Sequence, residues 1–66
     1  MNRSYHWVLT LEVPGVSRST DQGTYTPPEG STRQDAYLAI KTDVERRRPL
    51  LAGGLVVFFS LEPDQL

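Results

Sequence analysis

A chain of 66 residues has room for one domain, and a domain of this size buries only about 60% of the surface that its unfolded form exposes. The sequence contains no cysteine and a single histidine, which excludes a disulfide framework and a Cys/His metal site as means of stabilising a small core. Seven basic and eight acidic side chains give a formal net charge of −1, so no general field attracts nucleic acid or anionic membranes. We expect one domain over residues 1–66, without cofactor or metal.

Residues 5–13 alternate in a period of two, which predicts a half-buried strand. The odd positions are all apolar, namely Tyr5, Trp7, Leu9, Leu11 and Val13. Polar residues at His6, Thr10 and Glu12 interrupt the continuous apolar run that a signal peptide or membrane helix requires. We therefore expect a cytoplasmic protein with no membrane segment, and a strand that ends at Pro14-Gly15.

A second, shorter strand is predicted over residues 22–26, because Thr24, Tyr25 and Thr26 favour strands and Pro27 ends the segment. The polar residues 17–21 before it read as a solvated loop at the tip of a hairpin. The first two strands would then pair as an antiparallel hairpin.

One helix is predicted to begin at Ser31 or Thr32, both good N-cap residues, with Gln34 or Asp35 at the capping-box spacing. Its apolar stripe consists of Ala36, Tyr37, Ile40 and Val44. Asp43 and Arg47 are spaced for an ion pair, and Pro49 ends the helix. We expect the following Leu50-Leu51 to cap the core.

The last strand is predicted over residues 55–61, with odd positions toward the helix and Val56 and Phe58 on the opposite face. A right-handed crossover through the helix makes this strand antiparallel to the first. The predicted fold is α+β, with order ββαβ along the chain, a three-stranded mainly antiparallel sheet in the order 2-1-3, and one helix on one face. A truncated β-grasp-like arrangement, with the last strand parallel to the first, is the alternative.

Two groups of residues follow from this arrangement. The predicted core consists of Trp7, Leu9, Leu11, Ile40, Val44, Val57 and Phe59. The helix cannot cover the second face of the sheet, where an apolar group of Val8, Val56 and Phe58 is expected. These three are the candidate interaction residues. The uncharged last strand is also an edge open to pairing. We expect a homodimer or another protein partner, formed through this face or this edge.

Candidate chemistry in the sequence is sparse. His6 is the only side chain that titrates near neutrality, and it has no second histidine or cysteine as partner, so we assign no catalytic residue. Arg33 at the helix start and Arg46, Arg47 and Arg48 at its end are candidate contacts for an anion or for nucleic acid. Positive charge at a helix C-terminus has a simpler explanation in the helix dipole.

Three segments, residues 5–10, 26–35 and 58–63, together resemble short uncharacterised proteins encoded in actinobacterial genomes and on their mobile elements. The resemblance covers nearly the whole chain and implies an accessory protein, but it assigns no activity to any residue. From the sequence we therefore expect a non-enzymatic, self-associating interaction module. The alternative is a small nucleic-acid-binding accessory protein that uses the arginine-rich helix end.

Overall fold

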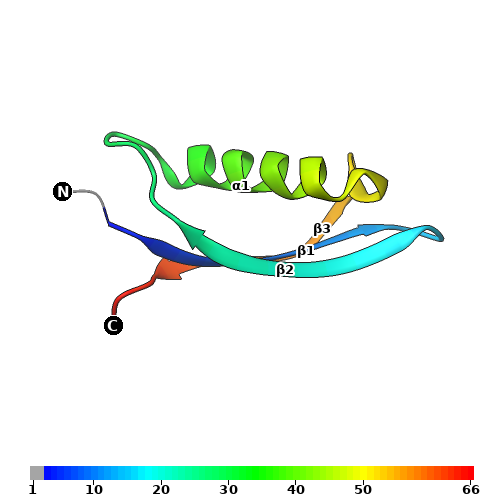
Figure 1. Ribbon diagram of the computed structural model, residues 1–66, viewed down its shortest axis with the longest axis horizontal. Coiled ribbons are helices and arrows are strands. Elements are labelled where there is room, and N and C mark those ends of the chain that lie inside the picture. The colour runs from blue at the N-terminus through cyan, green and yellow to red at the C-terminus, as the bar shows by residue number, and fades with distance from the viewer. Residues whose placement is uncertain (1–2) are drawn as a thin grey trace.

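The computed structural model describes residues 3–66, which form three strands and one α-helix in two layers (Figure 1). The strands are β1 (Tyr5–Val13), β2 (Ser17–Tyr25) and β3 (Leu55–Pro63), and the helix α1 is Arg33–Arg47. The sheet order is β2-β1-β3, and both outer strands are antiparallel to β1. The predicted α+β fold, with chain order ββαβ and sheet order 2-1-3, is confirmed, and the parallel alternative is excluded.

The hairpin between β1 and β2 is tighter than the sequence suggested. Val16 N donates to Val13 O at 2.9 Å, and the two residues between them are Pro14 and Gly15, the latter with φ of 76°. This is the sequence and geometry of a type II turn, in which glycine supplies the positive φ. The turn is short, so Ser17 already pairs with Val13 and β2 begins there.

The predicted loop over residues 17–21 is therefore wrong, because this segment is the first half of β2. Its side chains alternate between half-buried and exposed positions, but nearly all of them are polar. Period-two patterning without apolar residues gives no strand signal in a sequence. The segment forms a strand because it pairs with β1. A hydrogen bond of 2.8 Å between the hydroxyls of Thr10 and Thr20 strengthens this pairing.

Helix α1 begins with the predicted capping box. The Thr32 Oγ1 accepts from Asp35 N at 3.1 Å, and the Asp35 carboxylate accepts from Thr32 N at 3.0 Å. Arg48 is the C-cap, and a short 3₁₀ helix, η1 (Pro49–Leu51), follows. The helix turns its small and aliphatic residues Ala36, Ile40 and Val44 to the sheet, where all three are buried.

The core lies between α1 and the central strand β1. The buried cluster consists of Trp7, Leu9, Leu11, Ile40, Val44 and Leu51. Phe59 is half-buried and packs against this cluster, as do Val13, Tyr25 and Leu61. Six of the seven predicted core residues thus lie in or against the core, and the exception is Val57. Leu51 fulfils its expected capping role, but Leu50, which was expected to cap the core with it, has an exposed fraction of 70%.

A β-bulge in β3 explains the position of Val57. Thr10 pairs with Phe58 and Leu11 pairs with Val56, so Val57 is an extra residue with no partner of its own on β1. Its exposed fraction is 46%, and the prediction that it lies in the core is wrong. The extra residue also changes the phase of the strand. Val56, predicted on the outer face, consequently stands opposite the buried Leu11 on the side of the helix.

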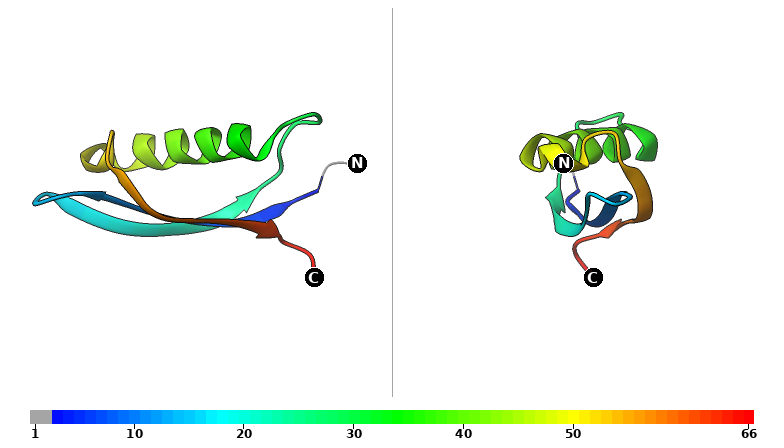
Figure 2. Two further views of the ribbon diagram at one scale, coloured as in Figure 1. Left: turned by 180° about the vertical axis from the view of Figure 1, so that it is seen from behind. Right: turned by 90° about the vertical axis from the view of Figure 1, so that its right-hand side faces the viewer.

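The molecule is elongated, with extents of 42 × 21 × 16 Å and a Cα radius of gyration of 12.3 Å. A compact chain of this length has a radius of about 11 Å. Figure 2 shows the cause, since the long hairpin extends beyond the helix at the turn end and the helix covers the sheet on one face only. A thin, long molecule leaves much of its sheet uncovered.

Candidate functional site

The candidate site is the exposed first half of β3, which we call the open edge and define as residues 55–58. Its four consecutive residues are all hydrophobic, and their exposed fractions are 61% for Leu55, 37% for Val56, 46% for Val57 and 52% for Phe58. Within the part of the chain that the structure describes, no strand pairs with the outer side of β3. A run of exposed apolar residues on an unpaired edge is unusual unless it has a function.

The second half of β3 is covered where the first half is not. The ring of Tyr37 meets the ring of Phe59 in an edge-to-face contact, with centroids 5.1 Å apart and planes at 77°. The guanidinium of Arg33 lies 5.5 Å from the centre of the same ring, in cation–π contact. These two helix residues hold Phe59 against the core. The cover from the helix thus begins at Phe59, immediately after the open edge.

The opposite edge of the sheet has a different character. Strand β2 exposes Arg18, Thr20, Gln22 and Thr24 on alternate positions and carries no large exposed hydrophobic residue. Polar and charged side chains of this kind protect an edge against unwanted pairing. The two edges of one sheet therefore differ in chemistry, and only the β3 edge presents an apolar surface.

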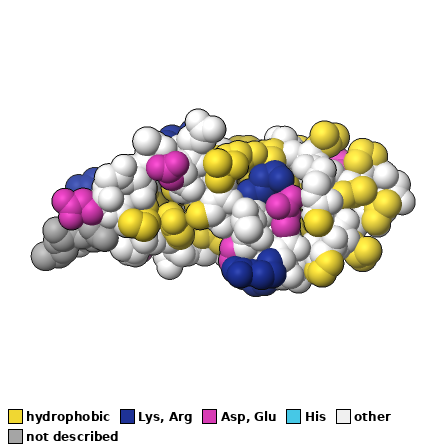
Figure 3. Space-filling view, turned by 90° about the horizontal axis from the view of Figure 1, so that it is seen from above, with side chains coloured by type: hydrophobic (Ala, Val, Ile, Leu, Met, Phe, Trp, Pro, Cys, Tyr) yellow, Lys and Arg dark blue, Asp and Glu magenta, His cyan; other side chains and the backbone are white. Residues whose placement is uncertain are grey.

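Other exposed hydrophobic residues lie toward the same end of the molecule as the start of β3. They are Val16 in the hairpin turn and Leu50 in η1, with exposed fractions of 61% and 70%. The space-filling view shows hydrophobic side chains gathered toward the end that carries the turn and η1 (Figure 3). Exposed hydrophobic side chains are therefore found beyond the open edge at this end of the molecule.

The predicted interaction residues are only partly brought together. Val8 is half-buried and pairs with Ser60, and Phe58 stands two residues further along β3, a diagonal neighbour on the outer face. Val56 lies on the other face because of the bulge. Leu55 and Val57 were missed as surface residues. The signal that could have found them is the unbroken apolar run over residues 55–59, which does not fit a strand with one solvated face.

The arginine cluster at the end of α1 is largely paired with carboxylates. Asp43 bonds both Arg46 at 2.8 Å and Arg47 at 2.9 Å, which confirms the predicted pair with Arg47. Arg48 makes a two-pronged contact with Asp21 of β2, with nitrogen–oxygen distances of 2.8 Å. Three positive and two negative side chains leave little net charge for binding phosphates.

The paired charges shift the pKa values of these groups. The hydrogen bonds and charge of Arg48 lower the pKa of Asp21, and the bonds from Arg46 and the charge of Arg47 lower the pKa of Asp43. Asp21 in turn raises the pKa of Arg48. Arg33, the remaining candidate contact, is at the other end of the helix, about 20 Å away at 1.5 Å per residue. The structure does not join it to the other three.

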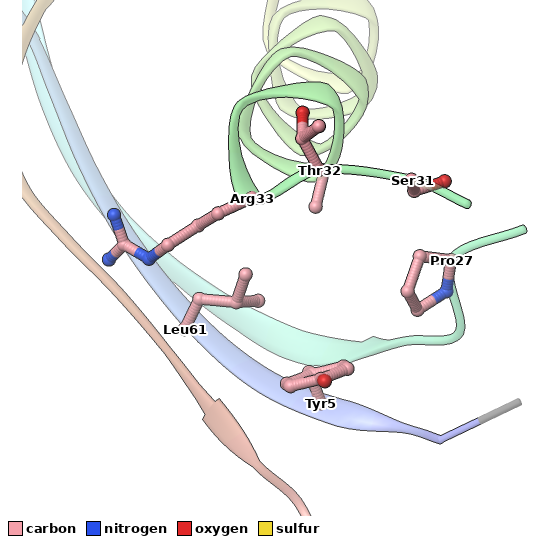
Figure 4. A pocket seen from close by; sticks show the side chains of 7 residues that line it. Tyr5, Pro27, Ser31, Thr32, Arg33 and Leu61 are labelled. Atoms are coloured by element: carbon pink, nitrogen blue, oxygen red, sulfur yellow. The ribbon is translucent and has the colours of Figure 1, made fainter. Parts of the chain in front are cut away.

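At the start of the helix the capping box uses the amides of Thr32 and Asp35, and the carboxylate of Asp35 adds a negative charge that disfavours an anion there. A small hollow of about 200 Å³ lies beside it (Figure 4). Tyr5 and Leu61 line its sheet side, and Pro27 and Thr32 line the opposite side. The side chain of Arg33 runs over Leu61 toward Phe59. The hollow has no group of converging polar atoms that would orient a ligand.

His6 is on β1, where its Nε2 lies 3.0 Å from the Gln22 Oε1 of β2. No group of three or more His, Cys, Asp or Glu side chains among residues 3–66 is arranged to hold a metal ion. None of the helices in the described range is long and apolar enough to cross a membrane. No protein-family model matches the sequence, and neither a curated protein nor a solved structure matches this chain.

Proposed function

We propose that this protein is a small, non-enzymatic interaction module that associates with itself through β3. The observation that carries the proposal is the exposure of four successive hydrophobic side chains, residues 55–58, on a strand whose outer side has no partner among residues 3–66. Unpaired backbone groups and exposed apolar side chains on one edge are the two components of strand-to-strand association.

The size of the domain supports the same conclusion. A chain of this length has a thin core, and here the buried cluster consists of six residues from β1, α1 and η1. Burial of one large aliphatic or aromatic side chain contributes about 1.5–3 kcal/mol. Burial of the side chains of the open edge would therefore contribute a substantial part of the total free energy of unfolding of a small domain.

The test is the molecular mass of the protein in solution at high micromolar concentration, measured by light scattering or sedimentation. We expect a dimer for the parent protein and a shift toward monomer for Phe58→Asp, with the helical and strand content retained by circular dichroism. Leu38→Asp is the matched control, because Leu38 is as exposed as Phe58, with exposed fractions of 50% and 52%. Leu38 lies on the helix, so this substitution leaves β3 unchanged. We expect Leu38→Asp to remain dimeric.

A monomeric mass for the parent protein at these concentrations would overturn the proposal. Equal loss of the dimer in Phe58→Asp and Leu38→Asp would also count against it, because it would indicate a general loss of solubility or folding and not a contact at β3.

The alternative of a nucleic-acid-binding accessory protein has weaker support, because Asp43 and Asp21 engage the three arginines at the helix end. Proteins that bind through several phosphate contacts lose affinity steeply as salt rises. Titration of mixed DNA and RNA at increasing salt concentration tests this alternative. We expect no retention of nucleic acid at physiological ionic strength.

A further inference from the structure

The hydrogen bonding of β3 to β1 determines which groups of β3 are free. Asp64 N donates to Ser4 O at 3.0 Å, at the position that continues the pairing of Tyr5 with Pro63. In an antiparallel ladder, pairs that exchange hydrogen bonds alternate with pairs that do not. Ser60, opposite Val8, and Phe58, opposite Thr10, are therefore bonded to β1. Phe59 and Leu61 direct their N–H and C=O groups away from β1, to the open side.

Two features limit the stretch of β3 in which every second residue offers a free N–H and a free C=O group on the side away from β1. Pro63 is in the same phase as Phe59 and Leu61, and it has no N–H to donate. At the other end, the bulge at Val57 breaks the alternation, so that Leu55, opposite Glu12, again directs its groups toward β1. The regular free side therefore runs over residues 58–62, and its bonding groups belong to Phe59 and Leu61.

From this geometry we infer that two copies of the chain pair their β3 strands antiparallel about a two-fold axis at Ser60, an inference that rests on the proposed self-association. In this register Phe59 of one copy is opposite Leu61 of the other, and both have their hydrogen-bonding groups free. Each such pair exchanges both of its hydrogen bonds. If the axis passed between two adjacent residues of β3, the free N–H and C=O groups of one copy would lie opposite groups of the other copy that are already bonded to β1. An axis at Phe58 would place Leu61 opposite the occupied Leu55.

The side chains fit the same register. Ser60 is small and uncharged, so the two copies of this residue can approach closely at the axis. Phe58 is opposite the Glu62 of the other copy, and Val57 is opposite its Pro63, so the paired segment reaches the near half of the open edge. The two three-stranded sheets become one sheet of six strands, with both helices on the same face. The polar β2 strands form the outer edges of this assembly.

Single cysteines test the register, because the natural chain has none. In Ser60→Cys the two Cα atoms form a non-hydrogen-bonded pair about 4.5 Å apart, a distance that a disulfide spans. In Phe58→Cys each introduced thiol is opposite Glu62, and the two thiols are about 13 Å apart along the strand. We expect Ser60→Cys to form a covalent dimer rapidly under mild oxidation. Phe58→Cys, and Thr24→Cys on β2, should form little.

A second measurement needs no substitution. The amides of Phe59 and Leu61 face solvent in the monomer, so their hydrogen exchange should slow as protein concentration rises. The amide of Thr24 on β2 should show no such dependence.

A third variant separates edge pairing from stacking of the outer faces. Phe58→Lys places a positive charge opposite Glu62 of the other copy and should retain the dimer, whereas Phe58→Asp places two negative charges opposite one another. If the outer faces stack, both charges should disrupt association equally.

The outcomes distinguish this inference from the proposed function. A dimeric parent protein with rapid cross-linking at Phe58→Cys but not at Ser60→Cys would overturn the register and leave self-association intact. A monomeric parent protein would overturn both.

Discussion

Trp7 packs closely against Gly23 across the hairpin. They are direct partners across β1 and β2, and the indole ring lies over the glycine. A Cβ atom at position 23 would be 3.1 Å from Cζ2 of Trp7 and 3.3 Å from Cε2. Trp7 is buried, with an exposed fraction of 5%, and has little room to move. The absence of a side chain at Gly23 is what allows the largest core residue to fit.

We therefore predict that Gly23→Ala destabilises the protein by about 1–2 kcal/mol, because overpacking at Trp7 outweighs the small gain from replacing glycine in a strand. Urea unfolding followed by tryptophan fluorescence measures the effect. Thr24→Ala, at the exposed neighbouring position, is the control and should change the midpoint little. A midpoint for Gly23→Ala at or above that of the parent would contradict the prediction.

Asp21 and Arg48 join β2 to the end of the helix, and their contact makes stability depend on pH. Because the pKa of Asp21 is lower in the folded state than in the unfolded state, the folded protein holds this carboxylate ionised more readily. The resulting stabilisation is fully present above the unfolded-state pKa of about 4 and is lost as the pH falls through the folded-state value.

We predict that Asp21→Asn lowers the free energy of unfolding at pH 7. The difference from the parent should shrink as the pH falls below about 4 and disappear once the carboxyl is protonated in both states. Unfolding midpoints between pH 2 and pH 7 measure this change. A difference that stays constant over the whole range would show that charge is not the cause.

At the scale of elements, the bulge in β3 decides which part of the strand joins the core. Before the bulge, residues 55–57 are exposed, and after it Phe59 and Leu61 pack against the cluster. Val56 takes the position opposite Leu11 that a regular strand would have given to Val57. Leu51 of η1 belongs to the buried cluster, and its exposed fraction is 1%. The short 3₁₀ helix is thus a structural part of the core and more than a connection.

Because Leu51 is buried and Val57 is exposed, we predict that truncating each to alanine lowers the free energy of unfolding by different amounts. Leu51→Ala should cost about 2–5 kcal/mol, as expected for a fully buried leucine, whereas Val57→Ala should cost less than about 1 kcal/mol in the monomer. Chemical denaturation at low protein concentration compares the two. Equal losses would show that the bulge is absent in solution and that Val57 packs in the core.

At the scale of the whole molecule, association and stability are linked. A partner that binds only the folded state stabilises it by an amount that increases with concentration. Because the chain has a thin core and an elongated shape, that contribution is a large share of its total free energy of unfolding.

We accordingly predict that the melting temperature of the parent protein rises by several degrees between low and high micromolar concentration. Phe58→Asp should melt at a temperature independent of concentration. Differential scanning calorimetry over a concentration series provides the measurement, with Leu38→Asp again as the matched control. A concentration-independent melt for the parent would mean that folding and association are not coupled.

Local signals in the sequence were sufficient to predict the helix, the strands and their order along the chain. Period-two patterning in β1, the β-prone apolar run in β3, the capping residues Thr32 and Asp35, and Pro49 after the helix are local signals. They are carried by residues close together in the chain. Together with the right-handed crossover rule they were sufficient to predict the sheet order and most of the core.

The full length of β2, the bulge at Val57 and the pairing of Arg48 with Asp21 follow from tertiary contacts. Each depends on which residues of distant segments lie opposite one another. A polar strand such as β2 carries no hydrophobic pattern of its own, and one extra residue in β3 shifts the phase of all residues before it. The open edge was therefore predictable as an apolar segment of an edge strand, but the faces of its individual side chains were not.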